Sequence, residues 1–268
     1  PLLSNLSPVE TFQVVLPLTA AVDLAAYDLR ETAVIQTGVR LIQMLAAVVS
    51  GQQTITNIAP TLQNVWAPND DRVAELLNTA LIFCADHELN VSAFAARTAA
   101  SAEATPYAAV MAGLAALRGR RHGGATEQVS AFFQEAAEPQ QARQVVANRL
   151  TRGDRIPGFG HPLYPEGDPR GRALLEKVTA VYPDSPAVIL ANSVITAVAD
   201  IIGDLPTIDL ALVTLARAAQ LPTGSPLTLF ALGRTAGWIG QALEQYRSNQ
   251  LIRPRAKYTG EKPKELRV

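Results

Sequence analysis

The pattern that most constrains the fold is a run of capped helical segments with no strand between them. Ser-Pro at 7–8, Asp-Pro at 168–169 and Ser-Pro at 185–186 each place a capping residue before proline, which is typical of a helix start. Apolar residues recur at helical spacing within 73–84, and alanine dominates 91–117. No stretch alternates apolar and polar residues as a half-buried strand does. The sequence therefore predicts an all-α fold of roughly ten helices.

The expected helices divide the chain into two parts. Those between residues 140 and 202 follow the glycine-flanked His122 and include the loop of the glycine-flanked His161, which suggests a smaller unit that closes on a larger one. We expect a large helical domain formed by 1–125 and 203–268, and a small one formed by 126–202. Helices are predicted over 6–28, 31–50, 126–135, 140–151, 169–181, 186–202 and 225–248, from Asn69 or Asp70, and from Ile208 after a Thr207 cap, whereas 52–68 is expected to be less regular.

Composition excludes several classes of protein. The 268 residues are 48% hydrophobic and 18% charged, with a net charge of −1, so the chain can bury a large core and offers no electrostatic case for binding nucleic acid. No segment is expected to be long and apolar enough to span a bilayer, since the best candidate, 187–199, is too short, and no signal-peptide pattern is present, so no membrane partner is expected. The single cysteine, Cys84, fits a reducing compartment and a buried structural thiol. These features predict a cytoplasmic location.

Residues 156–172, IPGFGHPLYPEGDPRGR, concentrate side chains that carry chemistry. Two glycines allow a tight turn directly before His161, and Asp168 caps a helix that places Arg170 in its first turn. A histidine can polarise an oxygen and a guanidinium can grip a carboxylate, so the stretch predicts a site for a small acidic substrate. The alternative is a Gly/Pro-rich connection with a solvated histidine.

All three histidines, His87, His122 and His161, lie at helix ends or in glycine-rich loops. A structural role is the better interpretation of each one alone, but three such placements together favour a site. Their spacing does not match a metal site, so no metal is expected. No GxSxG nucleophile elbow occurs, and the glycines at 158–160 lack the context of a dinucleotide loop.

Six motifs carry a resemblance to a known family. They are DHELNVSAFAAR (86–97), RHGGA (121–125), PGFGHPLYPEGDPR (157–170), PTIDLAL (206–212), GRTAGWIGQALEQ (233–245) and RPRAKYTG (253–260). They resemble the citrate synthase family and occur in that family's order. The resemblance implies an all-α, two-domain homodimer with a small mobile domain.

The resemblance also implies an activity, the condensation of acetyl-CoA with oxaloacetate to give citrate and CoA. Asp209 matches the base that removes a proton from the acetyl methyl group. His122 matches the hydrogen-bond donor to the thioester oxygen, and His161 matches the residue that polarises the oxaloacetate carbonyl. Acetyl-CoA is then a substrate, and no cofactor is implied.

Further positions match the family's ligand-binding residues. Arg253 is expected to reach across the dimer into the neighbouring site. For Arg234 and Arg253, ordinary surface charge is the interpretation without the resemblance. The matching substrate ligands are His87, His161, Arg170, Arg234 and Arg253, and the matching CoA-binding residues are Ile156, Pro157, Gly158, Phe159 and Gly160.

Departures from the family pattern leave alternatives open. Thr207 and Leu210 replace an asparagine and an aromatic residue around the base, Pro165 stands where members often carry a cation for CoA phosphate, and Gly240-Gln241 replaces Ala-His. The chain is also shorter than most members at its N-terminal side and begins with proline. A 2-methylcitrate synthase, a citryl-CoA lyase and a non-catalytic paralogue that binds a carboxylate or acyl-CoA are the alternatives.

Overall fold

The computed structural model describes residues 6–261, and this part of the chain is all-α, as predicted. It contains 12 α-helices and no strand. The helices are α1 (Pro8–Ala20), η1 (Leu24–Tyr27, 3-10), α2 (Glu31–Ser50), α3 (Ile58–Trp66), α4 (Val73–Ala85), α5 (Val91–Ser101), α6 (Pro106–Leu117), α7 (Ala125–Ala136), η2 (Pro139–Gln141, 3-10), α8 (Ala142–Thr151), α9 (Pro169–Val181), α10 (Pro186–Ile202), α11 (Ile208–Ala218) and α12 (Ser225–Ser248).

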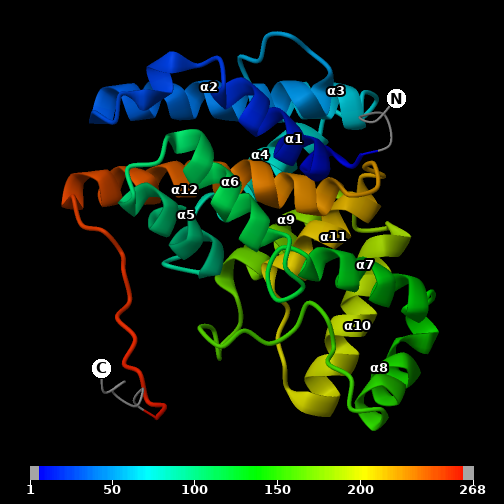
Figure 1. Ribbon diagram of the computed structural model, residues 1–268. Helices are drawn as coiled ribbons and strands as arrows, with labels where there is room; N and C mark the ends of the chain where they lie inside the picture. Colours follow the sequence, from blue (N-terminus) through cyan, green and yellow to red (C-terminus); the bar gives the residue numbers. More distant parts are fainter. Residues whose placement is uncertain (1–5, 262–268) are drawn as a thin grey trace.

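The long helix α12 is the centre of the arrangement. It packs on α4, α5, α6 and α2, while α7, α8 and α10 lie at the end of the molecule opposite α2 and α3 (Figure 1). Its Trp238 is fully buried, next to Gly113 of α6, where an added Cβ would come within 2.6 Å of the indole. After α12 the chain runs outward without regular structure (Figure 1).

Two glycines of α12 allow it to touch α4 through its backbone. A Cβ on Gly233 would meet the carbonyl oxygen of Leu81 at 2.6 Å, and one on Gly237 would meet that of Ala85 at 2.1 Å. Such distances leave no room for a side chain. This contact fixes the end of α4, and the turn after it that carries His87, against the helix that carries Arg234.

The structure corrects several predicted boundaries. Segment 52–68 contains α3, because Pro60 is its third residue and lies in the first turn, where a missing N–H costs no hydrogen bond. The predicted cap at Asn69 or Asp70 is wrong: α4 begins at Val73, and the Asp70 carboxylate accepts hydrogen bonds from Arg72 and from the hydroxyl of Tyr182.

The first predicted helix, 6–28, is shorter than expected. The Ser7 capping box and Pro8 start α1 as predicted, but α1 ends at Ala20 and a separate 3-10 turn follows. The alanine-rich segment 91–117 forms two packed helices, α5 and α6, which a left-handed Glu103 and the Thr105-Pro106 start separate.

Helix α2 contradicts the expectation that no segment is long and apolar enough to span a bilayer. By length and composition, with 20 residues and a mean hydropathy of 1.5, it is long and apolar enough to cross a membrane. The core helix of a globular fold passes the same test, and α2 packs on α12 and α3 through residues such as Val34, Leu41 and Leu45.

The predicted division into domains, 1–125 with 203–268 and 126–202, stays a prediction. Helix α9 belongs to the expected small domain, yet it packs on both α11 and α4 of the expected large one. These contacts place Arg170, at the start of α9, beside residues of both parts.

Candidate active site

A cavity of about 440 Å³ gathers most of the predicted site residues. Its lining combines polar groups from five separate stretches of the chain with a few apolar side chains. A larger groove of about 680 Å³ lies between α2, α3, α4 and α12, but Glu75 is the one ionisable side chain among the residues that line it. The smaller cavity is therefore the candidate active site. Its lining includes His87, Arg121, His122, His161, Arg170, Asp209, Phe230 and Arg234.

The glycine-rich loop before His161 is tied to the segment that precedes α11. Gly158 and Gly160 have φ values of 84° and 69°, which favour glycine. The amide of Thr207 donates to the carbonyl of Gly158 at 2.9 Å, and the amide of Gly160 donates to the carbonyl of Leu205 at 3.0 Å. These bonds bring His161 and Asp209 into one cavity although they are far apart in sequence.

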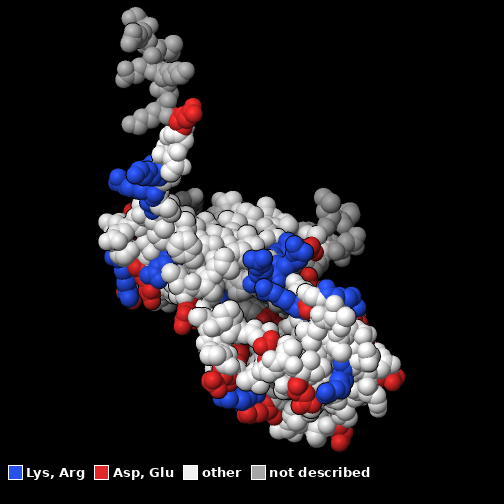
Figure 2. All heavy atoms as spheres, turned by 90° about the horizontal axis from the view of Figure 1, so that it is seen from below, with Lys and Arg blue, Asp and Glu red and all other residues white. Residues whose placement is uncertain are grey.

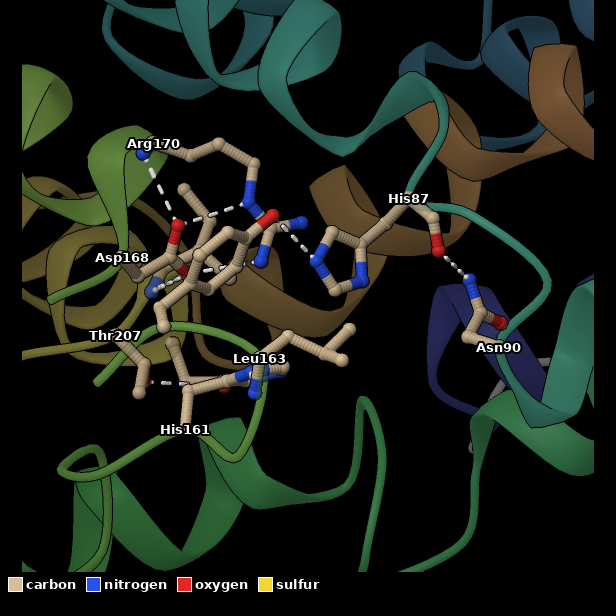
Figure 3. A network of polar contacts seen from close by, with 10 residues as sticks. His87, Asn90, His161, Leu163, Asp168, Arg170 and Thr207 are labelled. Carbon is tan, nitrogen blue, oxygen red and sulfur yellow. Dashed lines mark hydrogen bonds and ion pairs between the residues drawn. The ribbon is translucent and has the colours of Figure 1, made fainter. Parts of the chain in front are cut away.

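Asp168 organises the start of α9 as predicted. Its carboxylate accepts from the Arg170 amide at 3.0 Å and from the Arg170 guanidinium at 3.0 and 2.8 Å (Figure 3). It also accepts from the amide of Ile208, the first residue of α11, at 3.1 Å. Burial opposes ionisation of Asp168, but the hydrogen bonds from Arg170 and Ile208 outweigh it and lower the pKa of the carboxyl. Arg170 is thus fixed at the edge of the cavity.

Asp209 lies in the first turn of α11 and faces the cavity. The hydroxyl of Thr207 donates to its Oδ2 at 3.3 Å, so Thr207 occupies the predicted cap position but bonds a side chain instead of the helix backbone. Oδ1 is buried and has no hydrogen-bond partner within residues 6–261. Burial raises the pKa of Asp209 to about 6. A carboxylate with this pKa is a stronger base than an exposed aspartate and is still ionised at pH 7.

Arg234 is buried on α12, so the interpretation as surface charge is wrong for this residue. Its Nε donates to the carbonyl of Cys84 at 2.6 Å, and its guanidinium lies over the ring of Phe230 at 5.1 Å. In the part of the chain that the structure describes, its two terminal nitrogens have no hydrogen-bond partner. Burial lowers the pKa of Arg234. A buried guanidinium with two open donors suits an anionic ligand.

His87 and His161 lie side by side. Their rings are 5.3 Å apart in an edge-to-face arrangement (Figure 3). The ring of Tyr164 contacts both. Burial, followed by the charge of Arg170, lowers the pKa of His87 to about 4. Burial also lowers the pKa of His161. Both imidazoles are therefore neutral at pH 7 and can each donate one N–H.

His122 lies opposite them in the loop between α6 and α7. Its Nε2 is 2.7 Å from the hydroxyl of Ser92, which also accepts from Trp238 at 3.1 Å. Its ring stands edge-on to Phe230 at 5.6 Å. Burial, followed by the charge of Arg234, lowers the pKa of His122 to about 4, so this histidine is neutral as well.

Two groups of predicted residues do not line the cavity. Arg253 lies in the exposed segment after α12 that leaves the body of the molecule (Figure 1). Ile156 and Phe159 are buried in the core, and the backbone bonds described above occupy Gly158 and Gly160. The roles predicted for Arg253 and for 156–160, a carboxylate ligand across a dimer and a CoA contact, stay predictions.

Cys84 is buried, and burial raises the pKa of its thiol to about 12. This confirms the structural thiol that its apolar stripe predicted. Cys84 contributes to the site through its backbone carbonyl, which accepts a hydrogen bond from Arg234 and orients that side chain. Backbone roles of this kind leave no signal in a sequence.

Sequence reasoning missed several residues that shape the site, namely Ser92, Arg121, Tyr164, Phe230 and Trp238. Ser92, Arg121, Tyr164 and Trp238 lie inside the motifs quoted above, and Arg121 stands directly before His122. The position of Arg121 next to a predicted catalytic histidine was the signal that the sequence offered for this residue. Arg121 is exposed and forms no ion pair within the described range, 6–261. Figure 2 shows basic side chains gathered beside the hollow between the two parts of this face.

Known proteins share both the sequence pattern and the fold. Residues 9–255 match the family model described as "Citrate synthase, C-terminal domain". Citrate synthase 2 of Bacillus subtilis is 35% identical over 69% of this chain and 51% of its own length. The 2-methylcitrate synthase of Mycobacterium tuberculosis is 32% identical over 72% of this chain and 50% of its own length. The chain thus spans about half the length of these curated relatives.

Solved structures agree. The ternary complex of Thermoplasma acidophilum citrate synthase with carboxymethyl coenzyme A and oxaloacetate has a TM-score of 0.80, with 24% identity over 96% of this chain and 74% of that one. Citryl-CoA lyase from Hydrogenobacter thermophilus has a TM-score of 0.65, with 24% identity over 84% of this chain and 86% of that one. At this identity the structures support the fold, and the match over 9–255 decides the relationship. The chain belongs to the citrate synthase family.

Proposed function

We propose that this protein is an acyltransferase that condenses acetyl-CoA with oxaloacetate to form citrate and CoA. The observation that carries the proposal is a single cavity in which the carboxylate of Asp209 shares the lining with three neutral histidines and three guanidinium groups. No step requires a metal or a cofactor, and acetyl-CoA is consumed as a substrate.

In the first step Asp209 takes a proton from the methyl group of acetyl-CoA. The negative charge moves to the thioester oxygen, where His122 donates a hydrogen bond. The Ser92 hydroxyl has two acceptors within reach, Oδ1 of Asn90 at 2.8 Å and Nε2 of His122 at 2.7 Å. We infer that in the reacting state it donates to Nε2, which leaves the imidazole proton on Nδ1 for the thioester. A donor placed where charge develops lowers the barrier most, because it stabilises the transition state more than the bound substrate.

In the second step the enolate carbon attacks the ketone carbon of oxaloacetate, and the ketone oxygen takes a proton from His161 as it becomes the hydroxyl of citryl-CoA. The proton that Asp209 removed from the methyl group then returns to His161, so both residues recover their starting forms. Water then cleaves the thioester: its oxygen joins the acyl carbon and its proton leaves with the CoA sulfur. Enclosure of the reactants protects the enolate from protonation by solvent.

The dicarboxylate is held by Arg170, Arg234 and His87. Arg234 offers two open donors from a buried position, and Arg170 offers the part of its guanidinium that Asp168 does not occupy. We further propose a homodimer in which Arg253 of one chain completes the site of the other. The exposed segment that carries Arg253 and the exposed apolar side chains at 18–27 suit such an interface.

The phosphates of CoA need a cation, and Pro165 leaves none between His161 and Asp168. Arg121, on the rim of the cavity, is the candidate. In an Arg121→Gln variant we expect KM for acetyl-CoA to rise about two- to fivefold, as for an exposed charge pair, with KM for oxaloacetate unchanged. Acetylpantetheine, which lacks the nucleotide phosphates, should be used equally well by both forms. Arg172→Gln, at another exposed arginine outside the cavity, is the control, and an equal effect there would remove Arg121 from the site.

Release of CoA thiol from acetyl-CoA and from propionyl-CoA, each with and without oxaloacetate, tests the proposal. We expect release that depends on oxaloacetate, and the ratio of the two rates separates a citrate synthase from a 2-methylcitrate synthase. The choice rests on one methyl group in an apolar pocket, which is worth about 1–3 kcal/mol. A folded protein that releases no thiol from either substrate would contradict the proposal.

Citryl-CoA lyase is the second candidate. The lyase from Hydrogenobacter thermophilus shares the fold of this chain, with a TM-score of 0.65. A lyase would break the carbon–carbon bond of citryl-CoA with the same residues in reverse. Formation of oxaloacetate from citryl-CoA, without net synthesis in the other direction, would favour this candidate.

A further inference from the structure

Tyr164 contacts three of the proposed substrate ligands but has no part in the steps above. Its hydroxyl is 2.7 Å from Nε2 of His87. Its ring centre is 5.0 Å from that of His161 and 5.7 Å from the guanidinium carbon of Arg170. The residue is half-buried in the loop between His161 and Asp168. It therefore joins this loop to the turn after α4 that carries His87.

The backbone of His87 is held independently of Tyr164. The side-chain amide of Asn90 donates to the carbonyl of His87 at 2.9 Å, and the side-chain oxygen of Asn90 caps α5 (Figure 3). The imidazole ring has a different support. Within the described part of the chain, the ring forms one hydrogen bond, between its Nε2 and the hydroxyl of Tyr164, and its Nδ1 has no partner. Tyr164 thus controls the ring but not the turn.

The direction of this hydrogen bond decides what His87 can do. A neutral imidazole carries one proton, on either Nε2 or Nδ1. If Nε2 carried it, the ring would donate to Tyr164 and present a lone pair on Nδ1, which repels a carboxylate. If the phenol donates to Nε2, the proton resides on Nδ1. Nε2 of His87 is the one acceptor within hydrogen-bonding distance of the Tyr164 hydroxyl among residues 6–261, which favours the second arrangement.

We propose that Tyr164 is a positioning residue for substrate binding: its hydroxyl donates to Nε2 of His87 and keeps the imidazole proton on Nδ1, as the donor to a carboxylate of the substrate. This inference rests on the proposed function for the identity of the ligand, a short dicarboxylate with a keto group. For the tautomer of His87, the inference rests only on the contact between Nε2 and the Tyr164 hydroxyl.

The test is a Tyr164→Phe variant, which keeps the ring packed on His161 and Arg170 and removes the hydroxyl. We expect the Kd for oxaloacetate, measured by calorimetry without acyl-CoA, to rise about three- to tenfold, as for the loss of one effective hydrogen bond. In a His87→Asn background the same change should have no further effect, because the asparagine amide needs no partner to fix its donor. Tyr182→Phe removes a hydroxyl bonded to Asp70, away from the cavity, and is the matched control.

The second readout is the tautomer itself, from ¹⁵N chemical shifts of labelled histidine in the free protein. We expect the proton of His87 on Nδ1 in the wild type and on both nitrogens in Tyr164→Phe, with the His87→Asn spectrum assigning the signals. An unchanged tautomer, or a loss of affinity no larger than in Tyr182→Phe, would overturn the proposal. A wild-type protein that binds no oxaloacetate would instead count against the proposed function, while the ¹⁵N shifts would still decide the role of Tyr164.

Discussion

Replacement of Asp209 by asparagine is expected to remove the proposed activity and to stabilise the fold at pH 7. Loss of a general base typically lowers kcat by about 10²–10⁴-fold. The gain in stability follows from the pKa of about 6 in the folded state, compared with 3.8 for an ordinary aspartate. A raised pKa means that the folded protein binds the proton more tightly than the unfolded chain does. The contribution of Asp209 to stability is therefore complete below pH 3.8 and is lost as the pH rises through about 6.

At pH 7 the ionised carboxylate then costs the fold up to about 3 kcal/mol, since one pKa unit corresponds to about 1.4 kcal/mol. Because Asp209 keeps partial contact with solvent through the cavity, we expect a gain of about 1–2 kcal/mol for Asp209→Asn. Denaturant unfolding of both forms at pH 4 and pH 7.5 measures it, and the difference between them should appear only at the higher pH. Asp184→Asn, at an exposed aspartate outside the cavity, is the control. Retention of most of the activity in Asp209→Asn would show that another group is the base.

Replacement of Arg234 by methionine is expected to produce the second large effect, in opposite directions on binding and on stability. The two buried terminal nitrogens of Arg234 have no hydrogen-bond partner within the described residues. The buried charge therefore lowers the stability of the folded protein until an anionic ligand pairs with it. Methionine is of similar length and apolar. We expect oxaloacetate affinity to fall by about 10²-fold or more, as for truncation of one partner of a buried charge pair, while the free energy of unfolding rises by about 1 kcal/mol.

The loss of the hydrogen bond to the Cys84 carbonyl limits that gain. Arg234→Lys tests whether charge alone is enough, because lysine keeps the positive charge but lacks the planar guanidinium. We expect its affinity for oxaloacetate to lie between those of Arg234→Met and the wild type. Arg247→Met, at an exposed arginine paired with Glu31, is the control for the change in residue type. Calorimetric titration with oxaloacetate and denaturant unfolding give the two quantities. Unchanged affinity in Arg234→Met would exclude this guanidinium as a substrate ligand.

The sequence predicted the class of the fold and much of the cavity because these features depend on local signals. Asp168-Pro169 starts α9 through a side-chain cap, and this places Arg170 in the first turn, where it shares a cavity with His161. Caps and glycine-rich turns act over a few residues, so they can be recognised without knowledge of the fold.

Long-range contacts could not be predicted in the same way. Arg234 reads as a surface charge, since only the approach of α4 to Gly233 and Gly237 buries it. Asp70 is predicted to cap α4, but α4 begins three residues later, and the Asp70 carboxylate is held by the Arg72 amide and by Tyr182, which is distant in the sequence. The raised pKa of Asp209 likewise comes from burial under other elements, and the motif around it contains no sign of that burial.

The contact between α9 and α11 has a consequence for motion. A Cβ on Gly171 would come within 2.6 Å of the backbone carbon of Thr207, and the carboxylate of Asp168 binds the amide of Ile208 across the same junction. We therefore expect the first turns of α9 and α11 to move together as one rigid body. If the cavity opens and closes around its ligand, the group that grips the carboxylate and the group that takes the proton travel together. The spacing of Arg170 and Asp209 is then preserved through every conformation, and the amide of Ile208 should be among the slowest to exchange with deuterium.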